Sequence, residues 1–330
     1  MPFMSRVTSL TSMPEAQLNR WIKRIGLLLI IGIVAFVAFY AVDRFRAPAA
    51  PIIDRETAAL EAAVLADPTD IASRGRLADL YVAAKRYDDA ITQYTEIIKT
   101  GKQDEAAYVS RGRALEMKGD LEAAAADYTK VVELATTGEM ANVDPMLESA
   151  YYGLGAIALQ QGRADEAVGH LLKALAIQRT DADAMNLLGA AYVKAGQPEK
   201  AVEPLRGAVE FVPIGWAEPY QTLADAYKAT GEAELAEWAG AMAAANNGDV
   251  AGAIARLKAI TDGKAGLDAR IGLGLLAEMS SDATTAEQWY RKALELDAQS
   301  TSAKLGLSRV AGTTEGHPSI LPSPSAEGTN

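Results

Sequence analysis

The 330-residue chain contains no cysteine. Disulfide bonds, thiolate metal sites, cysteine-linked haem and cysteine nucleophiles are therefore excluded. The same absence does not decide the compartment, because many proteins outside the cytoplasm also lack disulfides. Histidine is almost as scarce, with only His170 and His317.

Sequence signatures of catalysis are missing as well. The chain has no GxGxxG motif, no Walker-type phosphate loop and no metal-ligating residues at a suitable spacing. His170 is expected to project from its helix into solvent. The adjacent acids Asp88 and Asp89 fit an ordinary solvated helix face. Gly153 and Gly155 lie in an apolar helical run, where close helix packing explains them. We predict a protein that is not an enzyme, with no catalytic residues, metal, cofactor or small-molecule substrate.

Aromatic residues are few and basic residues are outnumbered. Aromatics make up 6% of the chain, whereas 49% of the residues are hydrophobic and alanine dominates. This composition is typical of helices that pack closely through small side chains, so we expect an all-α fold. Beyond residue 46 there are 26 Lys and Arg against 41 Asp and Glu, a net charge of −15. This charge repels nucleic acid and favours protein or peptide partners with basic segments.

The clearest local pattern lies in residues 182–213, which predict two helices joined by a tight turn. Leu188 and Tyr192 fall at helical spacing in the first helix. Gly196 is expected to end that helix and Pro198 to begin the second, the usual positions of these two residue types. The apolar stripe of such a hairpin is too narrow to form a core alone.

The same pattern recurs along the chain. Further copies are marked by Leu77, Tyr108, Leu154, Leu223 and Leu273. The order of leucine with a small residue, tyrosine, glycine, alanine, a large apolar residue, alanine and proline resembles the tetratricopeptide repeat, whose period is about 34 residues. Nine residues, 139–147, interrupt the phase. Between 217 and 267 three helical segments stand where two repeats need four, and the segment around Trp238 can belong to either neighbour.

The resemblance implies a right-handed superhelical solenoid with about six repeats, in which the first helix of each repeat builds a concave wall. In related proteins that wall holds an extended peptide or a partner helix. The corresponding candidates for peptide binding here are Arg76, Arg113, Tyr152, Asn186, Lys194 and Gln221. The lysine and asparagine set by which chaperone-binding members grip a terminal carboxylate is absent, since Gly75 and Asp79 stand where it would begin. A co-chaperone role therefore loses support.

Residues 25–42, IGLLLIIGIVAFVAFYAV, carry no charge. As a helix they would be roughly 27 Å long, about the thickness of the hydrocarbon core of a bilayer. Twelve of these eighteen residues are Leu, Ile, Val or Phe, and at about −0.3 to −0.6 kcal/mol each they favour insertion by roughly −4 to −7 kcal/mol. We therefore predict one transmembrane anchor.

A buried core helix and a cleaved signal peptide are the alternatives to an anchor. Charges on both sides of the segment disfavour the first, and the lack of a small-x-small cleavage site disfavours the second. Four basic residues precede the segment (Arg6, Arg20, Lys23 and Arg24) and three follow it (Arg44, Arg46 and Arg55). The positive-inside rule then places the amino terminus inside and the repeats outside the cytoplasm.

The remaining segments complete the predicted organisation. Residues 1–24 form a short tail, 43–53 a linker with two prolines, 54–311 the repeat domain with capping helices, and 312–330 a disordered tail. The first capping helix is expected to pack through Leu60, Ala63 and Leu65.

These features predict a membrane-anchored scaffold that binds proteins and assists assembly of a bacterial cell-envelope complex at the cytoplasmic membrane. A tethered adaptor with its repeats in the cytoplasm is one alternative. A periplasmic chaperone or cytochrome-maturation factor is another, and an enzyme with an unrecognised site is the third class.

Overall fold

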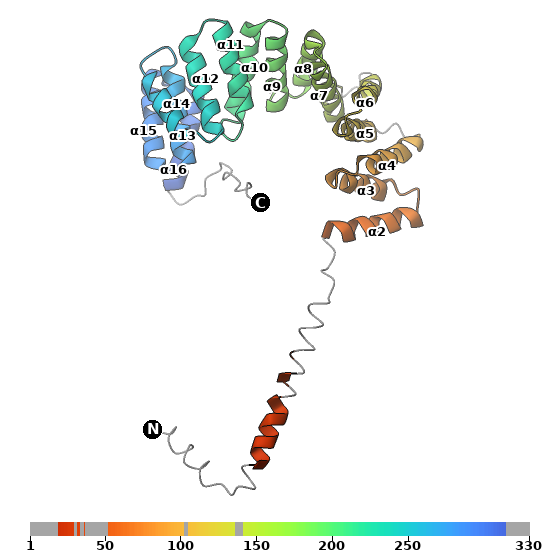
Figure 1. The fold of residues 1–330 in the computed structure, drawn as a ribbon. Helices are drawn as coiled ribbons and strands as arrows, with labels where there is room; N and C mark the ends of the chain where they lie inside the picture. The colour runs from red at the N-terminus through yellow and green to blue at the C-terminus, as the bar shows by residue number, and fades with distance from the viewer. Residues whose placement is uncertain are drawn as a thin grey trace. The chain divides into compact units, whose positions relative to one another are not determined.

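The computed structural model describes residues 19–29, 32–33, 36, 52–101, 105–135 and 141–314. Every regular element among these residues is a helix (Figure 1). The chain divides into two units, Met1–Ala59 and Leu60–Asn330.

Within the larger unit the helices form hairpin pairs in chain order. Four regular pairs come first: α3 (Ile71–Ala83) with α4 (Tyr87–Lys99), α5 (Glu105–Lys118) with α6 (Leu121–Ala135), α7 (Pro145–Gln160) with α8 (Ala164–Ile177), and α9 (Ala182–Lys194) with α10 (Pro198–Phe211). The short 3-10 helix η1 (Ala141–Val143) precedes α7. The second helix of each pair also packs on the first helix of the next pair.

The turn between α9 and α10 shows how the sequence produces a hairpin. Asp181 caps α9, because its Oδ1 accepts a hydrogen bond from the Ala184 amide at 3.0 Å. Gly196 has a φ of +72°, which glycine adopts without steric cost, and it ends α9. Pro198 then occupies the first turn of α10. The predicted hairpin is confirmed.

Large side chains of the second helices fill the space between successive first helices. Tyr128 of α6 is 3% exposed. A Cβ added at Gly112 of α5 or at Gly153 of α7 would lie 2.8 or 2.3 Å from its ring, so glycine at both places makes room for it. Gly155 of α7 gives the same room to Leu171 of α8, at 2.6 Å. Close helix packing therefore explains both glycines of α7.

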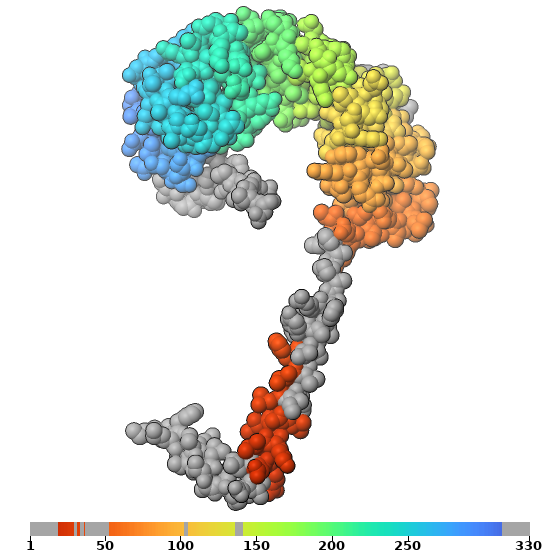
Figure 2. Space-filling model, in the orientation of Figure 1, coloured from red at the N-terminus to blue at the C-terminus, as the bar shows by residue number. Residues whose placement is uncertain are grey.

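The first helices also contact one another from pair to pair. α5 contacts α7, α7 contacts α9, and α9 contacts α11 (Glu218–Ala229). In a curved row of pairs the elements on the inner side come closer together, so the first helices line that side. Figures 1 and 2 show the larger unit as such a row, with an open inner side.

The row becomes irregular after α11. α12 (Ala233–Asn246) packs against α11, against α13 (Val250–Ala259) and against α14 (Gly266–Met279). Its buried residues extend over more than half of its circumference: Ala236, Trp238, Ala239, Ala241, Met242, Ala243 and Ala245. α12 is therefore the second helix of one pair and the first helix of the next. The three helices expected between residues 217 and 267 are confirmed.

α2 (Ile52–Ala66) precedes the first pair and begins two residues before the predicted repeat domain. Leu60 and Val64 pack against the core of the first pair, and the hydroxyl of Tyr81 donates to Glu61 Oε1 at 2.7 Å. Leu65, expected on the packing face, is 84% exposed. That expectation was wrong, because the apolar stripe runs through Leu60 and Val64, four residues apart.

At the other end, α15 (Ala283–Leu296) and α16 (Thr301–Thr314) complete the row. α16 packs on α15 and α14 and buries Ala303 and Val310. α16 extends to Thr314, so it includes the first three residues of the segment 312–330 that was predicted to be a disordered tail. Residues 315–330 lie outside the described part of the chain.

In the smaller unit, residues 19–29 are helical, as are 32–33 and 36. The apolar side chains of this segment are exposed: Trp21 52%, Ile22 58%, Ile25 53%, Leu27 58%, Leu28 67%, Leu29 61%, Ile33 60% and Phe36 68%. Among the residues that the structure describes, no helix has both the length and the apolarity to cross a bilayer. The expected span 25–42 is described only in part, and residues 1–18 and 37–51 lie outside the description.

Candidate protein-binding surface

The six candidate residues lie on successive first helices. Arg76 is on α3, Arg113 on α5, Tyr152 on α7, Asn186 and Lys194 on α9, and Gln221 on α11. Arg76, Arg113, Lys194 and Gln221 are exposed, Tyr152 is half-buried and Asn186 is buried. The structure therefore distributes the candidates over five successive first helices rather than in one pocket.

Acidic side chains gather around Tyr152 in the middle of this surface. Burial, followed by the charges of Asp183, Asp181 and Glu116, raises the pKa of Tyr152 to about 12, and Arg113 acts in the opposite direction. These groups come from α5, α7 and the start of α9. The structure thus brings Arg113 and Tyr152 together within a mainly negative environment.

Glu148 of α7 belongs to the same region and is 7% exposed. Its burial and then its hydrogen bond and charge interaction with Asp181 raise the pKa of Glu148 to about 7. Glu148 Oε1 accepts no hydrogen bond from the described residues. Once protonated, Glu148 can donate to Asp181, whose Oδ1 also caps α9. The pair therefore holds its proton at a pH at which an exposed glutamate has lost it.

Asn186 is less accessible than its predicted role requires. It is 3% exposed, and its Oδ1 has no hydrogen-bond partner among the described residues. A buried acceptor without a donor costs about 1–3 kcal/mol. In this structure the side chain of Asn186 is part of the interior, and contact with a partner backbone would need a rearrangement of α9.

Gln221 belongs to a chain of polar contacts along α11. Its Nε2 lies 3.5 Å from Asp225 Oδ1, which also accepts from Lys228 Nζ at 3.1 Å. All three side chains are exposed. Their surface presents both signs of charge and can pair with polar side chains of a partner.

His170 of α8 was expected in solvent, but its side chain is only 23% exposed. The ring centroid lies 6.2 Å from that of Tyr151 in α7, and Nδ1 is buried without a partner among the described residues. Burial lowers the pKa of His170, although Glu166, with Oε1 3.8 Å from Nε2, opposes this. The expectation was wrong because Tyr151 covers the ring.

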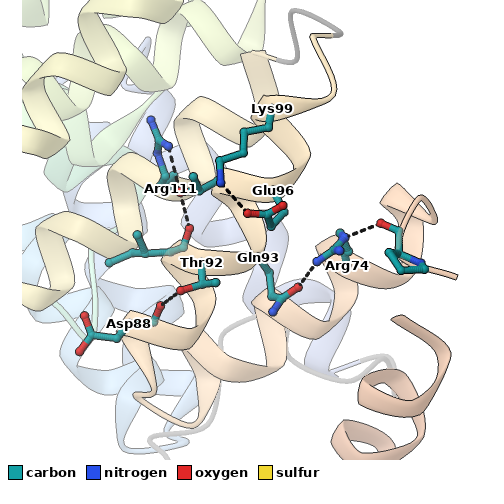
Figure 3. A network of polar contacts seen from close by, with 10 residues as sticks. Arg74, Asp88, Thr92, Gln93, Glu96, Lys99 and Arg111 are labelled. Atoms are coloured by element: carbon teal, nitrogen blue, oxygen red, sulfur yellow. Dashed lines mark hydrogen bonds and ion pairs between the residues drawn. The ribbon is translucent and has the colours of Figure 1, made fainter. Parts of the chain in front are cut away.

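One buried ion pair was not anticipated. The Arg111 guanidinium of α5 donates to Asp127 of α6 through Nη2 at 2.7 Å and Nε at 2.8 Å, and to Thr95 of α4 at 3.0 Å. Figure 3 shows this end of the row, where Arg74 of α3 also donates to Gln93 of α4 at 2.7 Å. These contacts fix neighbouring helices to one another and leave no chemistry open to a ligand.

Within the described ranges, no three His, Cys, Asp or Glu side chains are arranged to hold a metal ion. The described residues thus form a protein built from stacked helical hairpins, with an inner surface formed by their first helices. Models of the tetratricopeptide repeat match residues 146–212, and residues 57–105, 76–139 and 239–301. The chain belongs to the tetratricopeptide repeat family.

Individual relatives are distant. The human protein DnaJ homolog subfamily C member 3 is 27% identical over 155 residues, which cover 44% of this chain and 30% of that protein. The match thus spans less than a third of the length of this curated relative.

Three solved structures are similar to this chain at low identity. MamA from Desulfovibrio magneticus is 23% identical, with 54% of this chain and 96% of that chain covered and a TM-score of 0.46. The C-terminal part of a repeat protein from Cytophaga hutchinsonii is 19% identical, with coverages of 77% and 94% and a TM-score of 0.49. YrrB, described as having an unusual peptide-binding site, is 24% identical, with coverages of 65% and 97% and a TM-score of 0.37.

Proposed function

We propose that this chain is a membrane-anchored scaffold that binds protein or peptide partners along the inner side of its repeat row and helps to organise a complex of the bacterial cell envelope. The observation that carries the proposal is the row of first helices. From α5 to α11 they contact one another from pair to pair, and together with α3 they present Arg76, Arg113, Lys194 and Gln221 in exposed positions. A continuous wall with polar side chains at repeat spacing suits an extended segment of another protein.

The charge of this wall indicates the kind of partner. Residues 47–330 carry a net charge of −15, and the middle of the inner surface holds Glu116, Asp181 and Asp183 around Tyr152. Complementary charge increases the rate of encounter and disfavours acidic partners. Partners with basic segments therefore fit this surface best.

The proposal of a membrane anchor rests on the uncharged residues 25–42 and on the exposure of the apolar side chains in and just before this segment. Leu28 and Phe36 are 67% and 68% exposed within their unit, and contiguous exposed apolar side chains indicate contact with lipid or with another protein. Insertion of this uncharged stretch would hold the repeats beside the membrane. A bound partner would then meet membrane complexes at a raised effective concentration.

Site-specific photocrosslinking tests the binding surface. A photoreactive residue at Lys194 or Gln221 of the full chain is expected to form crosslinks to other proteins in cells. The same residue at Thr129 or Glu203, exposed positions on the second helices α6 and α10, serves as the control. Equal crosslinking from all four positions would remove the inner surface from the proposal.

Charge substitution tests the anchor. Each arginine near the centre of a membrane helix costs about 2.5–3.5 kcal/mol, so Ile33→Arg with Phe36→Arg offsets roughly the whole insertion energy of the segment. The double variant is expected in the soluble fraction after alkaline extraction, whereas Leu65→Arg, which adds charge at an exposed site on α2, stays with the membrane. A wild-type chain that is itself extracted by alkali would disprove the anchor.

The side of the membrane is a separate part of the proposal. The basic residues that flank the segment number four before it and three after it, which supports repeats outside the cytoplasm. Alkaline phosphatase fused after Asn330 is then expected to be active and a fused green fluorescent protein dark. The opposite result would indicate an adaptor that faces the cytoplasm.

A further inference from the structure

A cavity of about 110 Å³ lies in the C-terminal half of the repeat row, between α10, α12, α14 and α16. These helices belong to different pairs, and two contacts join them across long stretches of sequence. Arg206 Nη2 of α10 donates to Asp268 Oδ1 of α14 at 2.8 Å. Ser302 Oγ of α16 donates to Glu210 Oε1 of α10 at 3.3 Å. The cavity is therefore a product of the irregular packing around α12.

Most of the cavity wall is apolar. Trp238 and Met242 of α12 and Leu275 of α14 line it, and they are 6%, 0% and 6% exposed. Gly272 of α14 also lines it, where a Cβ would lie 2.9 Å from Met242 Sδ. Leu305 of α16 stands at its edge and is 53% exposed. An apolar hollow beside an exposed leucine is a place where an apolar guest would gain buried area.

The volume limits the size of that guest. Pockets for drug-sized ligands and cofactors measure about 300–1,000 Å³, and a cavity of about 150 Å³ accommodates benzene. At about 110 Å³, the present cavity is too small for a cofactor. It suits a single branched aliphatic side chain.

The charged residues around the cavity indicate which kind of partner residue would lie beside the bound apolar side chain. Two arginines line the cavity, Arg206 and Arg309. Arg206 pairs with Asp268, and Arg309 pairs with Glu278, with Nη2–Oε1 at 2.9 Å. Burial lowers the pKa of Arg206, but the hydrogen bond and charge of Asp268 outweigh it and raise that pKa. Glu210, in contrast, meets the neutral hydroxyl of Ser302 and forms no ion pair within the described residues. The edge of the cavity therefore carries one uncompensated negative charge.

We propose that this cavity is an anchor site for a partner protein, in which one leucine-like side chain fills the hollow and an adjacent lysine or arginine of the partner pairs with Glu210. The inference rests on the proposed protein-binding function and adds a defined specificity site to it. The surplus negative charge favours a basic protein segment over an anionic lipid surface. Because both lining arginines are already paired, they offer no free cation to an acidic protein segment.

Short labelled peptides test the proposal on the full chain in detergent micelles. Three nine-residue probes carry Lys-Leu, Lys-Ala or Glu-Leu at the centre of a Gly-Ser sequence, and fluorescence anisotropy gives their dissociation constants. Loss of about three buried methylene-sized groups is expected to weaken the Lys-Ala probe by roughly tenfold or more relative to Lys-Leu. The Glu-Leu probe is expected to bind about as weakly.

Matched variants assign the binding to the cavity. Ser302→Leu fills the hollow, and Ser308→Leu makes the same change at an exposed position of α16 outside it. Glu210→Gln removes the charge while it keeps an acceptor for Ser302, and Glu203→Gln is its control on α10. We expect Ser302→Leu to abolish the preference for Lys-Leu over Lys-Ala, and Glu210→Gln to abolish the preference for Lys-Leu over Glu-Leu.

Every other result counts against the site. Equal binding of the three probes, or no binding of any, would overturn the anchor site and leave the inner surface to be decided by crosslinking. Lys-Leu binding that responds equally to Ser302→Leu and Ser308→Leu would do the same. A circular dichroism melt of each variant excludes loss of folding as the cause.

Discussion

The two halves of the repeat row use their second helices differently. From α3 to α10 each second helix buries one stripe, as α8 does with Ala167, Leu171 and Ala174. In the C-terminal half α12 buries seven residues over more than half of its circumference and packs against α11, α13 and α14. In the first half each second helix therefore packs on the two first helices beside it, whereas α12 packs on three α-helices.

This difference determines where function-specific geometry can arise. A regular series repeats the same groove, so its surface varies only through the side chains that it presents. Sharing α12 changes the packing itself and brings α10 close enough to α14 and α16 for Arg206 to reach Asp268 and Ser302 to reach Glu210. The cavity of the C-terminal half follows from this one irregular helix.

The largest expected effect comes from emptying a core position in each half. Leu171→Ala in α8 and Met242→Ala in α12 both truncate side chains that are 0% exposed, so each should lower the free energy of unfolding by about 2–5 kcal/mol. Hydrogen exchange should separate them: faster exchange is expected in α7–α9 for the first variant and throughout α10–α16 for the second. If faster hydrogen exchange extends over equally few helices in both variants, α12 is an ordinary second helix.

Next in size is the pH dependence of the acid pair in the regular half. The folded-state pKa of Glu148 is raised to about 7 from the usual 4.5, so its contribution to stability is present below pH 4.5 and is lost as the pH rises to 7. Glu148→Gln imitates the protonated acid and should remove this loss, which amounts to at most about 3 kcal/mol.

Urea unfolding at pH 5 and pH 8 measures this effect. The variant should gain stability relative to the wild type as the pH increases, whereas Glu203→Gln, an exposed position on α10, should change little. If Glu148→Gln and the wild type show parallel pH profiles, Glu148 does not hold a proton in the folded state.

Much of this architecture could be predicted from the sequence, because the hairpin signals are local. Gly196 and Pro198 mark one turn and fall where the structure has it. The segment around Trp238 was recognised as fitting either neighbour, since its apolar residues are not confined to one stripe. A signal for the buried ion pair was also present: Arg111 stands 34 residues after Leu77, at a position where an apolar residue is expected.

Burial and long-range contacts could not be predicted in the same way. The repeat pattern gives the helix on which Asn186 and His170 lie, but not the neighbouring side chains that cover them. Arg206 and Asp268 are 62 positions apart, and a period of about 34 residues describes only adjacent repeats. The cavity was therefore missed, because it depends on helices that are not neighbours in the pattern.

Tyr128 and Tyr290 each pack against a glycine of a neighbouring helix. Gly153→Ala would place a Cβ 2.3 Å from Tyr128, and Gly306→Ala one 2.4 Å from Tyr290, at a cost of about 1–3 kcal/mol each. Gly169→Ala, with nothing within 4 Å, should instead stabilise α8 by up to about 1 kcal/mol. Thermal melts rank the three.

The position of each glycine determines how far the damage extends. Gly153 lies inside the row, so its variant should loosen both adjacent pairs. Gly306 lies on the final helix, so hydrogen exchange should detect fraying of α16 with little change in α12. Fraying that reaches α12 after Gly306→Ala would mean that α16 is a structural part of the C-terminal half rather than its cover.

The smallest expected effect on stability, and the most direct test of the long-range contacts, is Asp268→Asn. The Arg206 side chain is 43% exposed, so loss of this charge pair should cost only about 1 kcal/mol. The spacing of α10 and α16 should respond more clearly, because the pair holds α10 against α14.

Electron paramagnetic resonance measures that spacing. Because the chain has no cysteine, spin labels can be placed at Glu203→Cys and Ser308→Cys alone, and the distance between them is measured. A broader distribution in Asp268→Asn is expected, while Asp225→Asn, an exposed change on α11, should leave it narrow. An unchanged distribution would mean that packing around α12 alone sets the curvature of this half, with the ion pair a consequence of it.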